Sequence, residues 1–377
     1  MAMRPEDPTR EGAHDAAADG SRPVARFEVR YSQILDHTGA VVGRLPKLAR
    51  EPRALIPLYR AMVLTRLFDA KAVALQRTGQ LGTYPSSLGQ EATAVGLGAA
   101  LESRDVLLPF YRDTGTQFMR GVRMTDILLY WGGDERGMAY EGPVEDFPIS
   151  VPIATHAPHA VGVAYALKHR AESRAAVCSL GDGATSKGDF YEALNAAGVW
   201  QLPLIFLVTN NQWAISVPRC DQSHAETLAQ KAIAAGIEGE QVDGNDVLAV
   251  YETMRRALAR ARAGGGPHLI EALTYRIADH TTADDASRYR DDAEVSRQRA
   301  LDPIDRVRKY LTAAGAWSDA DESTLEAECR LELEEGVKEY LATPARAPDS
   351  MFDHLFEALP AALEAQRDEV KKGGSRG

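Results

Sequence analysis

The hydrophobic pattern between residues 175 and 216 predicts a complete strand, helix and strand unit. An apolar, β-prone run spans residues 175–180, and apolar residues then recur at helical spacing, with Phe190 and Leu194 on one face. A second apolar run covers residues 204–208 after a Leu-Pro break. Because two strands joined by a helix of this length pair in parallel through a right-handed crossover, we expect the two runs to be neighbours in one sheet.

Similar patterns continue on both sides of this unit. The segments that read as strands are 106–110, 236–243 and 267–275, and those that read as helices are 53–77, the second half of 150–169, 227–235 and 246–262. Strands that alternate with helices predict an α/β fold with a doubly wound, mostly parallel sheet. The charged helical pattern from 303 to about 363 predicts a helical C-terminal extension.

Composition and chain-breaking residues divide the sequence into five parts. A flexible N-terminal arm (1–23) precedes an extended lead-in (24–52), the α/β domain (53–300), a helical region (301–365) and a flexible tail (366–377). The N-terminus lacks an apolar core segment, so we expect neither a signal peptide nor a transit peptide.

The charge and cysteine content narrow the classes of partner. The formal net charge is -11 and the pI is about 5.4, which argues against nucleic acid, and no apolar run reaches membrane-spanning length. The three cysteines Cys178, Cys220 and Cys329 show no Cys-x-x-Cys spacing, so neither disulfides nor a zinc site are expected. A reducing cytoplasm fits this composition.

Polar residues follow both strands of the central unit. Asp182 comes directly after the first strand and Asn211 follows the second, at the sheet edge where ligands bind in open α/β sheets. Gly181 and Gly183 allow backbone amides to approach a phosphate, and the helix beginning near Gly188 turns its positive end toward it. A carboxylate and an amide oxygen are suitable ligands for magnesium, so the pattern predicts a site for a metal diphosphate.

Two other strand ends carry candidate chemistry. Tyr111 and Arg112 follow the strand at 106–110, where an arginine can bind a phosphate with two hydrogen bonds; a surface ion pair with Asp113 is the alternative. His280 lies in the loop after the strand at 267–275, and its position favours function over simple solvation.

The sequence GDG, then twenty-six intervening residues, then NN, resembles the thiamine diphosphate-binding motif. The segments GQLGTYPSSLGQEA, NNQWAISVP and DHTTADDASRYR further resemble the alpha subunits of two-chain 2-oxo acid dehydrogenases. They look closest to bacterial pyruvate dehydrogenase alpha subunits, and the branched-chain 2-oxo acid enzymes share nearly every motif. The resemblance implies the thiamine diphosphate-binding fold, with thiamine diphosphate and Mg as cofactors.

The resemblance also implies roles for individual residues. His280 is the catalytic residue, acting on the substrate or the lipoyl group, and the metal ligands are Asp182, Asn211 and the Trp213 carbonyl. A monovalent-cation site matches Ser150 and Thr155. The cofactor-binding residues are Tyr111, Arg112, Ile153 (backbone), Gly181, Asp182, Gly183, Ala184, Asn211 and Arg276. His156 stands where related chains carry Gln. Thr281 replaces the serine that is phosphorylated in the animal enzymes, and Thr209 replaces an Arg that branched-chain relatives place on the diphosphate.

The implied assembly is an alpha2beta2 heterotetramer. By resemblance, the glutamate that activates the cofactor belongs to a beta subunit, and one α/β domain uses most of residues 53–275, which leaves no room for a second. The chain alone should be inactive, and its acyl product should pass to a lipoyl-bearing acyltransferase. His280, with an ordinary pKa near 6.5, is expected to move protons near neutral pH.

Other classes of function fit the sequence less well. A nicotinamide dehydrogenase needs three glycines between a strand and a helix; Gly96 and Gly98 lie inside a predicted helix, where close helix packing explains them better. A P-loop is excluded because no glycine precedes Lys187. His156 and His159 lack a third metal ligand at suitable spacing, so packing is the favoured role. A non-catalytic interaction subunit stays open as an alternative.

Overall fold

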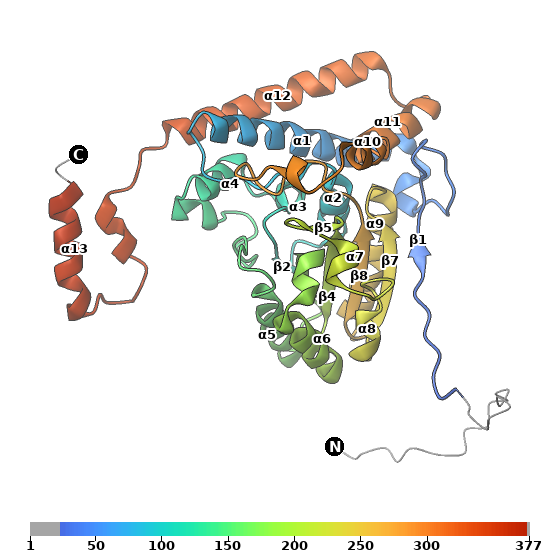
Figure 1. Ribbon diagram of the computed structural model, residues 1–377, viewed down its shortest axis with the longest axis horizontal. Coiled ribbons are helices and arrows are strands. Elements are labelled where there is room, and N and C mark those ends of the chain that lie inside the picture. Colours follow the sequence, from blue (N-terminus) through green and yellow to red (C-terminus); the bar gives the residue numbers. More distant parts are fainter. Residues whose placement is uncertain (1–22, 375–377) are drawn as a thin grey trace.

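A six-stranded, wholly parallel sheet forms the centre of the computed structural model, which describes residues 23–374 (Figure 1). The strand order is β1-β7-β8-β4-β3-β2. The strands are β1 (Tyr31–Ser32), β2 (Val106–Leu108), β3 (Ala176–Gly181), β4 (Leu204–Asn210), β7 (Glu238–Asp243) and β8 (His268–Leu273). The predicted doubly wound α/β fold is confirmed, and the central strands β3 and β4 are adjacent as predicted.

Each central strand is apolar on both faces, because helices cover both sides of the sheet. In β4, Ile205 and Leu207 belong to one hydrophobic core, whereas Phe206 and Val208 belong to a second core on the opposite face. This two-residue alternation is the pleat of a strand, and burial on both faces is typical of parallel sheets. The continuous apolar run seen in the sequence follows from it.

The helices divide between the two faces (Figure 1). The first core is covered by α1 (Ile56–Arg77), α2 (Glu91–Ala100), α9 (Val247–Arg262), α11 (Pro303–Ala313) and α12 (Asp319–Ala342). The second core is covered by α5 (His156–His169), α6 (Gly188–Trp200) and α8 (Lys231–Ala234). The remaining helices are α3 (Thr114–Met119), α4 (Met124–Trp131), α7 (Arg219–Gln222), α10 (Asp292–Arg299) and α13 (Ala361–Gly374), with short 3-10 helices η1 (Lys47–Arg50), η2 (Pro52–Leu55), η3 (Glu135–Met138), η4 (Asp182–Ser186), η5 (Ala286–Arg288) and η6 (Pro348–Phe352).

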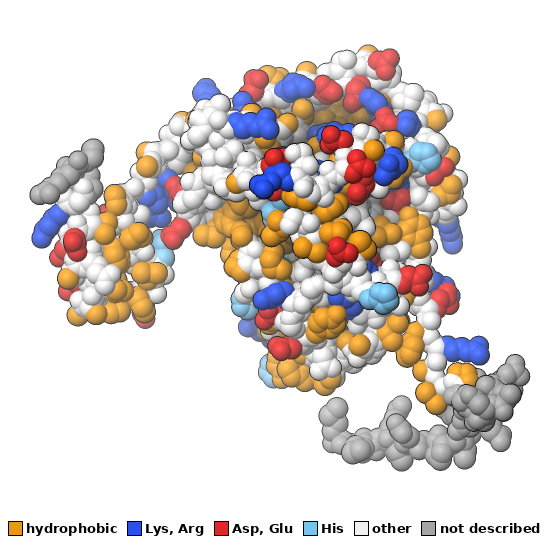
Figure 2. Space-filling view, in the orientation of Figure 1, with side chains coloured by type: hydrophobic (Ala, Val, Ile, Leu, Met, Phe, Trp, Pro, Cys, Tyr) orange, Lys and Arg blue, Asp and Glu red, His pale blue; other side chains and the backbone are white. Residues whose placement is uncertain are grey.

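Several predicted boundaries were wrong. The helix predicted at residues 227–235 is reduced to α8, because residues 223–230 form bends and turns. The tail predicted from residue 366 begins inside α13, which continues to Gly374 and packs on η6. In Figure 1 this C-terminal segment lies apart from the sheet, and Figure 2 shows apolar side chains gathered on it. Met351 and Phe356 of this segment are exposed. The predicted arm falls almost wholly outside the described residues, as do residues 375–377.

Within residues 23–374, no helix is both long enough and apolar enough to cross a membrane.

The two glycines considered for a dinucleotide motif serve helix packing, as predicted. A Cβ atom on Gly96 of α2 would lie 2.8 Å from the Val250 side chain of α9, and one on Gly98 would lie 2.5 Å from Met119. Real Cβ atoms do not approach so closely, so glycine permits the α2 and α9 backbones to come together.

We expect Gly96→Leu to lower the free energy of unfolding by about 2 kcal/mol, because the added side chain forces α2 away from Val250. Urea denaturation followed by circular dichroism measures this change. Gly162→Ala in α5 is the matched control, since its Cβ would meet no atom within 4 Å and alanine favours the helix. Equal stability of Gly96→Leu and the parent chain would contradict the packing argument.

Candidate active site

The site lies past the carboxyl ends of β3 and β4. These strands pair in parallel with Gly181 opposite Thr209, so Asp182 and Asn211 leave the sheet side by side. Both line a cavity of about 180 Å³. This cavity is also lined by most of the site residues expected from the sequence, namely Tyr111, Arg112, Ser150, Ile153, Gly181, Gly183, Ala184, Trp213 and His280.

Asp182 is suited to hold a cation. Its carboxylate is buried, takes part in no ion pair among the described residues, and accepts a hydrogen bond from Gln222 Nε2 at 2.8 Å. Burial raises the pKa of Asp182, opposed by the hydrogen bond from Gln222 and by the positive charge of Arg276. Asn211 Nδ2 donates to Gln90 Oε1 at 3.0 Å and its Oδ1 accepts from the Trp213 amide at 3.2 Å. Oxygen donors of these kinds fit magnesium.

A tight turn, η4, carries Asp182 into the site. The turn is pinned from behind by Lys231, whose buried Nζ donates to the Thr185 carbonyl oxygen at 2.7 Å. On the cavity side, a Cβ on Gly183 would lie 2.7 Å from the Ala214 Cβ, so glycine is needed where the hairpin of β5 (Trp213–Ala214) and β6 (Val217–Pro218) passes over the turn. The second glycine of the motif therefore serves close backbone approach.

Arg112 and His280 are joined directly by hydrogen bonds. Arg112 Nη2 donates to the His280 carbonyl oxygen at 2.8 Å and lies 3.0 Å from His280 Nδ1, while Nη1 donates to the Ser86 carbonyl oxygen. Because arginine can only donate, Nδ1 of His280 must accept and the ring proton resides on Nε2. The Tyr111 ring lies against both residues, 5.1 Å from the Arg112 guanidinium carbon and 6.3 Å from the imidazole centre.

The ordinary pKa near 6.5 that was assumed for His280 does not hold for the chain as it stands. Burial lowers the pKa of His280 to about 4, helped by the positive charges of Arg112 and Arg276 and opposed by Asp284. The imidazole is therefore neutral at pH 7. Sequence reasoning missed this because the burial of the loop and the approach of two arginines are tertiary features.

Arg276 departs from its expected position. It is fully buried and does not line the cavity; its Nη1 donates to the Trp213 carbonyl oxygen at 3.2 Å and its Nη2 donates to the Ile215 carbonyl oxygen at 2.8 Å. Burial lowers the pKa of Arg276 to about 10. Arg276 thus supports the β5–β6 hairpin from behind, and the Trp213 carbonyl expected to bind metal already accepts one hydrogen bond.

The loop before α5 places the remaining predicted residues. The Ser150 hydroxyl donates to the Pro152 carbonyl oxygen at 3.3 Å, Thr155 is exposed, and Ile153 is 42% exposed at the cavity rim. His156 is buried, and its Nε2 lies 2.6 Å from the Ser179 carbonyl oxygen. Within residues 23–374, no three His, Cys, Asp or Glu side chains gather as a metal site. The burial of His156 agrees with the packing role favoured for it.

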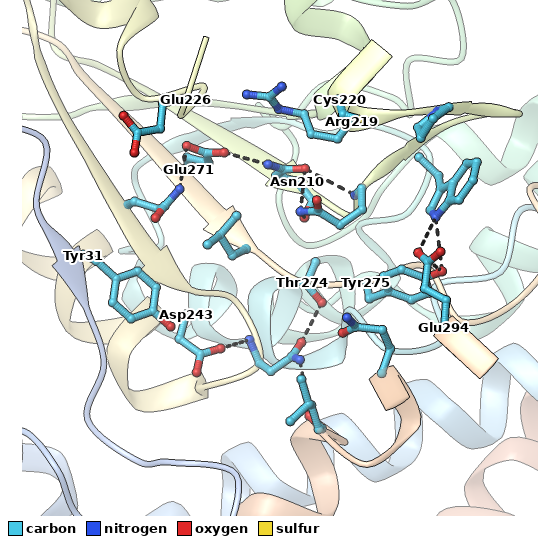
Figure 3. Close-up of a pocket in the computed structure, with 18 of the residues that line it drawn as sticks. Tyr31, Asn210, Arg219, Cys220, Glu226, Asp243, Glu271, Thr274, Tyr275 and Glu294 are labelled. Atoms are coloured by element: carbon cyan, nitrogen blue, oxygen red, sulfur yellow. Dashed lines mark hydrogen bonds between the residues drawn. The ribbon is translucent and has the colours of Figure 1, made fainter. Parts of the chain in front are cut away.

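A larger cavity of about 1090 Å³ lies beyond the carboxyl ends of β4, β7 and β8, on the other side of the β5–β6 hairpin (Figure 3). Its wall is polar, with Asn210 donating to Glu271 at 2.6 Å. This wall contains neither Asp182 nor Arg112. The smaller cavity is therefore the better candidate for the diphosphate.

A parallel sheet whose strand ends gather a glycine turn, a buried carboxylate and an arginine defines a ligand-binding protein of the doubly wound α/β class. Residues 59–349 match the family described as Dehydrogenase E1 component. The chain belongs to this family, which confirms the resemblance seen in the sequence and implies the use of thiamine diphosphate.

Similar proteins carry two kinds of name. A 3-methyl-2-oxobutanoate dehydrogenase subunit alpha of Mycobacterium tuberculosis is 45% identical over 317 residues, covering 83% of this chain and 86% of that protein. A pyruvate dehydrogenase E1 component subunit alpha of Staphylococcus epidermidis is 39% identical over 372 residues, covering 98% and 100%. One from Staphylococcus aureus is 38% identical over the same length.

Several residues that support the site were not predicted. Gln90 accepts a hydrogen bond from Asn211, and Gln222 donates one to Asp182. Lys231 donates one to the turn η4 that carries Asp182. Lys231 lies among alanines in the helix predicted at residues 227–235, so the sequence could indicate a buried lysine there. It could not indicate which group on η4 the lysine contacts. Local sequence patterns carry no information about contacts between residues forty or more positions apart.

We expect Asp182→Ala to weaken magnesium-dependent binding of thiamine diphosphate by more than about a hundredfold, because it removes the one carboxylate of the predicted metal site. Quenching of tryptophan fluorescence measures the affinity, since Trp213 lines the cavity. Asp189→Ala, an exposed acid at the start of α6, is the control. Retained affinity in Asp182→Ala would refute the metal assignment.

The titration of His280 gives a second prediction. In the cofactor-free chain its imidazole resonance should titrate near pH 4, and Arg112→Gln should raise the midpoint because it removes a neighbouring positive charge. Since the folded pKa lies below the unfolded value of about 6.5, stability attributable to His280 is full above pH 6.5 and falls toward pH 4. NMR of labelled histidines, assigned with His280→Asn, measures the midpoint. A midpoint near 6.5 would contradict the buried, arginine-flanked geometry.

Proposed function

We propose that this chain is the alpha subunit of a 2-oxo acid dehydrogenase complex that oxidatively decarboxylates pyruvate. The observation that carries the proposal is the gathering of Asp182, Asn211, Arg112 and His280 in one cavity at the strand ends. The family to which the chain belongs supports it.

The residues in the cavity fit a magnesium diphosphate. Asp182, Asn211 and the Trp213 carbonyl would hold the metal, while Tyr111 and Arg112 would donate to the phosphates. When bound, thiamine diphosphate supplies a carbanion that adds to the 2-oxo acid and a ring that accepts the electrons released with carbon dioxide. The chain's own task is to bind and orient this group.

His280 would act as a hydrogen-bond donor in the reaction. Arg112 keeps Nδ1 free of a proton, so a neutral imidazole carries its proton on Nε2. From there it can donate a hydrogen bond to an oxygen of the substrate or to the sulfur of a lipoyl group. Binding of a diphosphate beside Arg112 would offset the positive charge that depresses the pKa of His280.

The site needs a second chain. A cavity of about 180 Å³ is smaller than the roughly 300–1,000 Å³ typical of cofactor pockets, so these residues supply only part of the wall. Two of the apolar side chains that line it are exposed, Ile153 by 42% and Ile215 by 57%. A beta subunit that covers these side chains would complete an alpha2beta2 enzyme, and the acyl group would pass to a lipoyl-bearing acyltransferase.

Pyruvate and 3-methyl-2-oxobutanoate remain the two candidate substrates. The relatives that cover almost the whole chain are named for pyruvate, whereas a relative with higher identity over a shorter length is named for 3-methyl-2-oxobutanoate. Thr209 supports pyruvate, since it replaces the arginine expected in branched-chain enzymes.

The proposal predicts activity only from the assembled enzyme. Co-expressed with a beta subunit of the same organism, the chain should release carbon dioxide from pyruvate when thiamine diphosphate and magnesium are added, with kcat/KM about tenfold or more above that for 3-methyl-2-oxobutanoate. Trapping of released radiolabelled carbon dioxide measures both rates.

The Asp182→Ala complex serves as the inactive control for this assay. A preference for 3-methyl-2-oxobutanoate would replace the pyruvate assignment with the branched-chain one. Absence of release from either acid, with the complex assembled, would overturn the enzyme proposal and favour a non-catalytic interaction subunit.

A further inference from the structure

Asp69 is a buried carboxylate in the middle of α1. It is 4% exposed and forms no ion pair among the described residues. Four hydrogen-bond donors surround it: Ser86 Oγ at 2.6 Å, the Ser87 amide at 2.6 Å, and Ser87 Oγ and the Tyr84 hydroxyl at 3.2 Å. Burial raises the pKa of Asp69, whereas the hydrogen bonds from Ser86 and Ser87 lower it.

All four donors belong to one short stretch of chain. A carboxylate buried without a cation is costly, and hydrogen bonds are what offset the cost. Because every donor comes from residues 84–87, the carboxylate of Asp69 holds that segment against α1. Its side chain forms no hydrogen bond with any other part of the described chain. We refer to residues 84–90 as the anchor segment.

The anchor segment contacts three parts of the proposed active site. The Ser86 carbonyl oxygen accepts from Arg112, whose other nitrogen holds His280. Tyr84 and Thr282 exchange two hydrogen bonds: the Thr282 amide donates to the Tyr84 carbonyl oxygen at 2.9 Å, and the Tyr84 amide donates to Thr282 Oγ1 at 3.0 Å.

The third contact is made at the far end of the segment. There the side-chain oxygen of Gln90 accepts from Asn211 Nδ2 at 3.0 Å. Arg112 and the loop of His280 thus rest on residues that Asp69 holds, and Asn211 rests on Gln90, three residues beyond Ser87 in the same segment.

We propose that Asp69 is a positioning residue for the active site, acting through the anchor segment on Arg112 and on the loop that carries His280. It touches neither substrate nor cofactor. Its carboxylate sets where the Ser86 carbonyl stands, the Ser86 carbonyl directs the Arg112 guanidinium, and the guanidinium fixes the position and tautomer of His280. The proposal rests on the proposed function for its consequence in catalysis, but its structural part is testable in the cofactor-free protein.

The test compares Asp69→Asn with Asp105→Asn in the assembled alpha and beta complex. The asparagine would place an NH2 donor where the carboxylate has an acceptor oxygen. The surrounding donors cannot all reorient, and the Ser87 backbone amide is the least able to do so. Asp105 is the matched control, because it is also buried, accepts a hydrogen bond from the Ala175 amide and pairs with Arg262. It directly precedes β2 and so lies at the amino ends of the strands, away from the site. Hydrogen exchange measured by mass spectrometry without cofactor is the first readout.

In Asp69→Asn we expect amide exchange in residues 279–285 to accelerate about tenfold or more, with peptides of α5 and α6 unchanged. The titration midpoint of His280 should rise toward its ordinary value as Arg112 is released. Asp105→Asn should alter neither. In the active complex, Asp69→Asn should lower kcat and weaken cofactor binding together.

A second variant guards against misfolding. Ser86→Ala/Ser87→Ala keeps Asp69 but removes two hydroxyl donors, and should accelerate exchange in residues 279–285 in the same way. Unchanged exchange and an unchanged His280 midpoint in folded Asp69→Asn and in the double variant would overturn the proposal, as would uniform acceleration over the whole chain. These readouts require no turnover, so they stand even if the complex decarboxylates neither acid.

Discussion

Parallel pairing of β3 with β4 is the constraint on which the site depends. The register that sets Gly181 opposite Thr209 brings the residues after both strands to one edge, so a carboxylate and an amide with twenty-eight residues between them become neighbours. A shift of one residue in either strand would also turn its buried side chains to the wrong core, since Phe206 and Leu207 face opposite sides. The packing of both cores therefore fixes the geometry of the site.

Several charged side chains buried near the carboxyl ends of these strands form no ion pairs with one another. Asp69, Asp113 and Asp182 are buried without an ion pair among the described residues, and so are Arg112 and Arg276. Burial raises the pKa of Asp113 to about 7, and burial also lowers the pKa of Arg276 to about 10. Direct pairing of these groups would be more stable for the chain alone. Under the proposed function, Asp182 would bind a metal and Arg112 would bind phosphates, so both would have to stay unpaired in the free chain, and the ligand would stabilise this arrangement.

The fold was readable from the sequence because strands buried on both faces and helices with one apolar face leave clear periods. Asp182, Asn211, Arg112 and His280 could be predicted to lie at one edge of the sheet because each follows a strand, and the four residues line one cavity. Arg276 was misplaced because its contacts are to backbone carbonyls of a hairpin that no pattern predicted. Whether the assigned residues bind the cofactor stays a prediction.

Asp69 shows what a closer reading of periodicity could have found. Helix α1 buries Leu58, Met62, Thr65, Asp69 and Ala72, which follow one another at three- and four-residue steps. A lone acid at a core position of a helix is expensive unless donors reach it, so its presence predicts a polar segment packed there. The sequence could have indicated such a segment, but its identity as residues 84–87, and its further contacts to Arg112, arise only when the chain is folded.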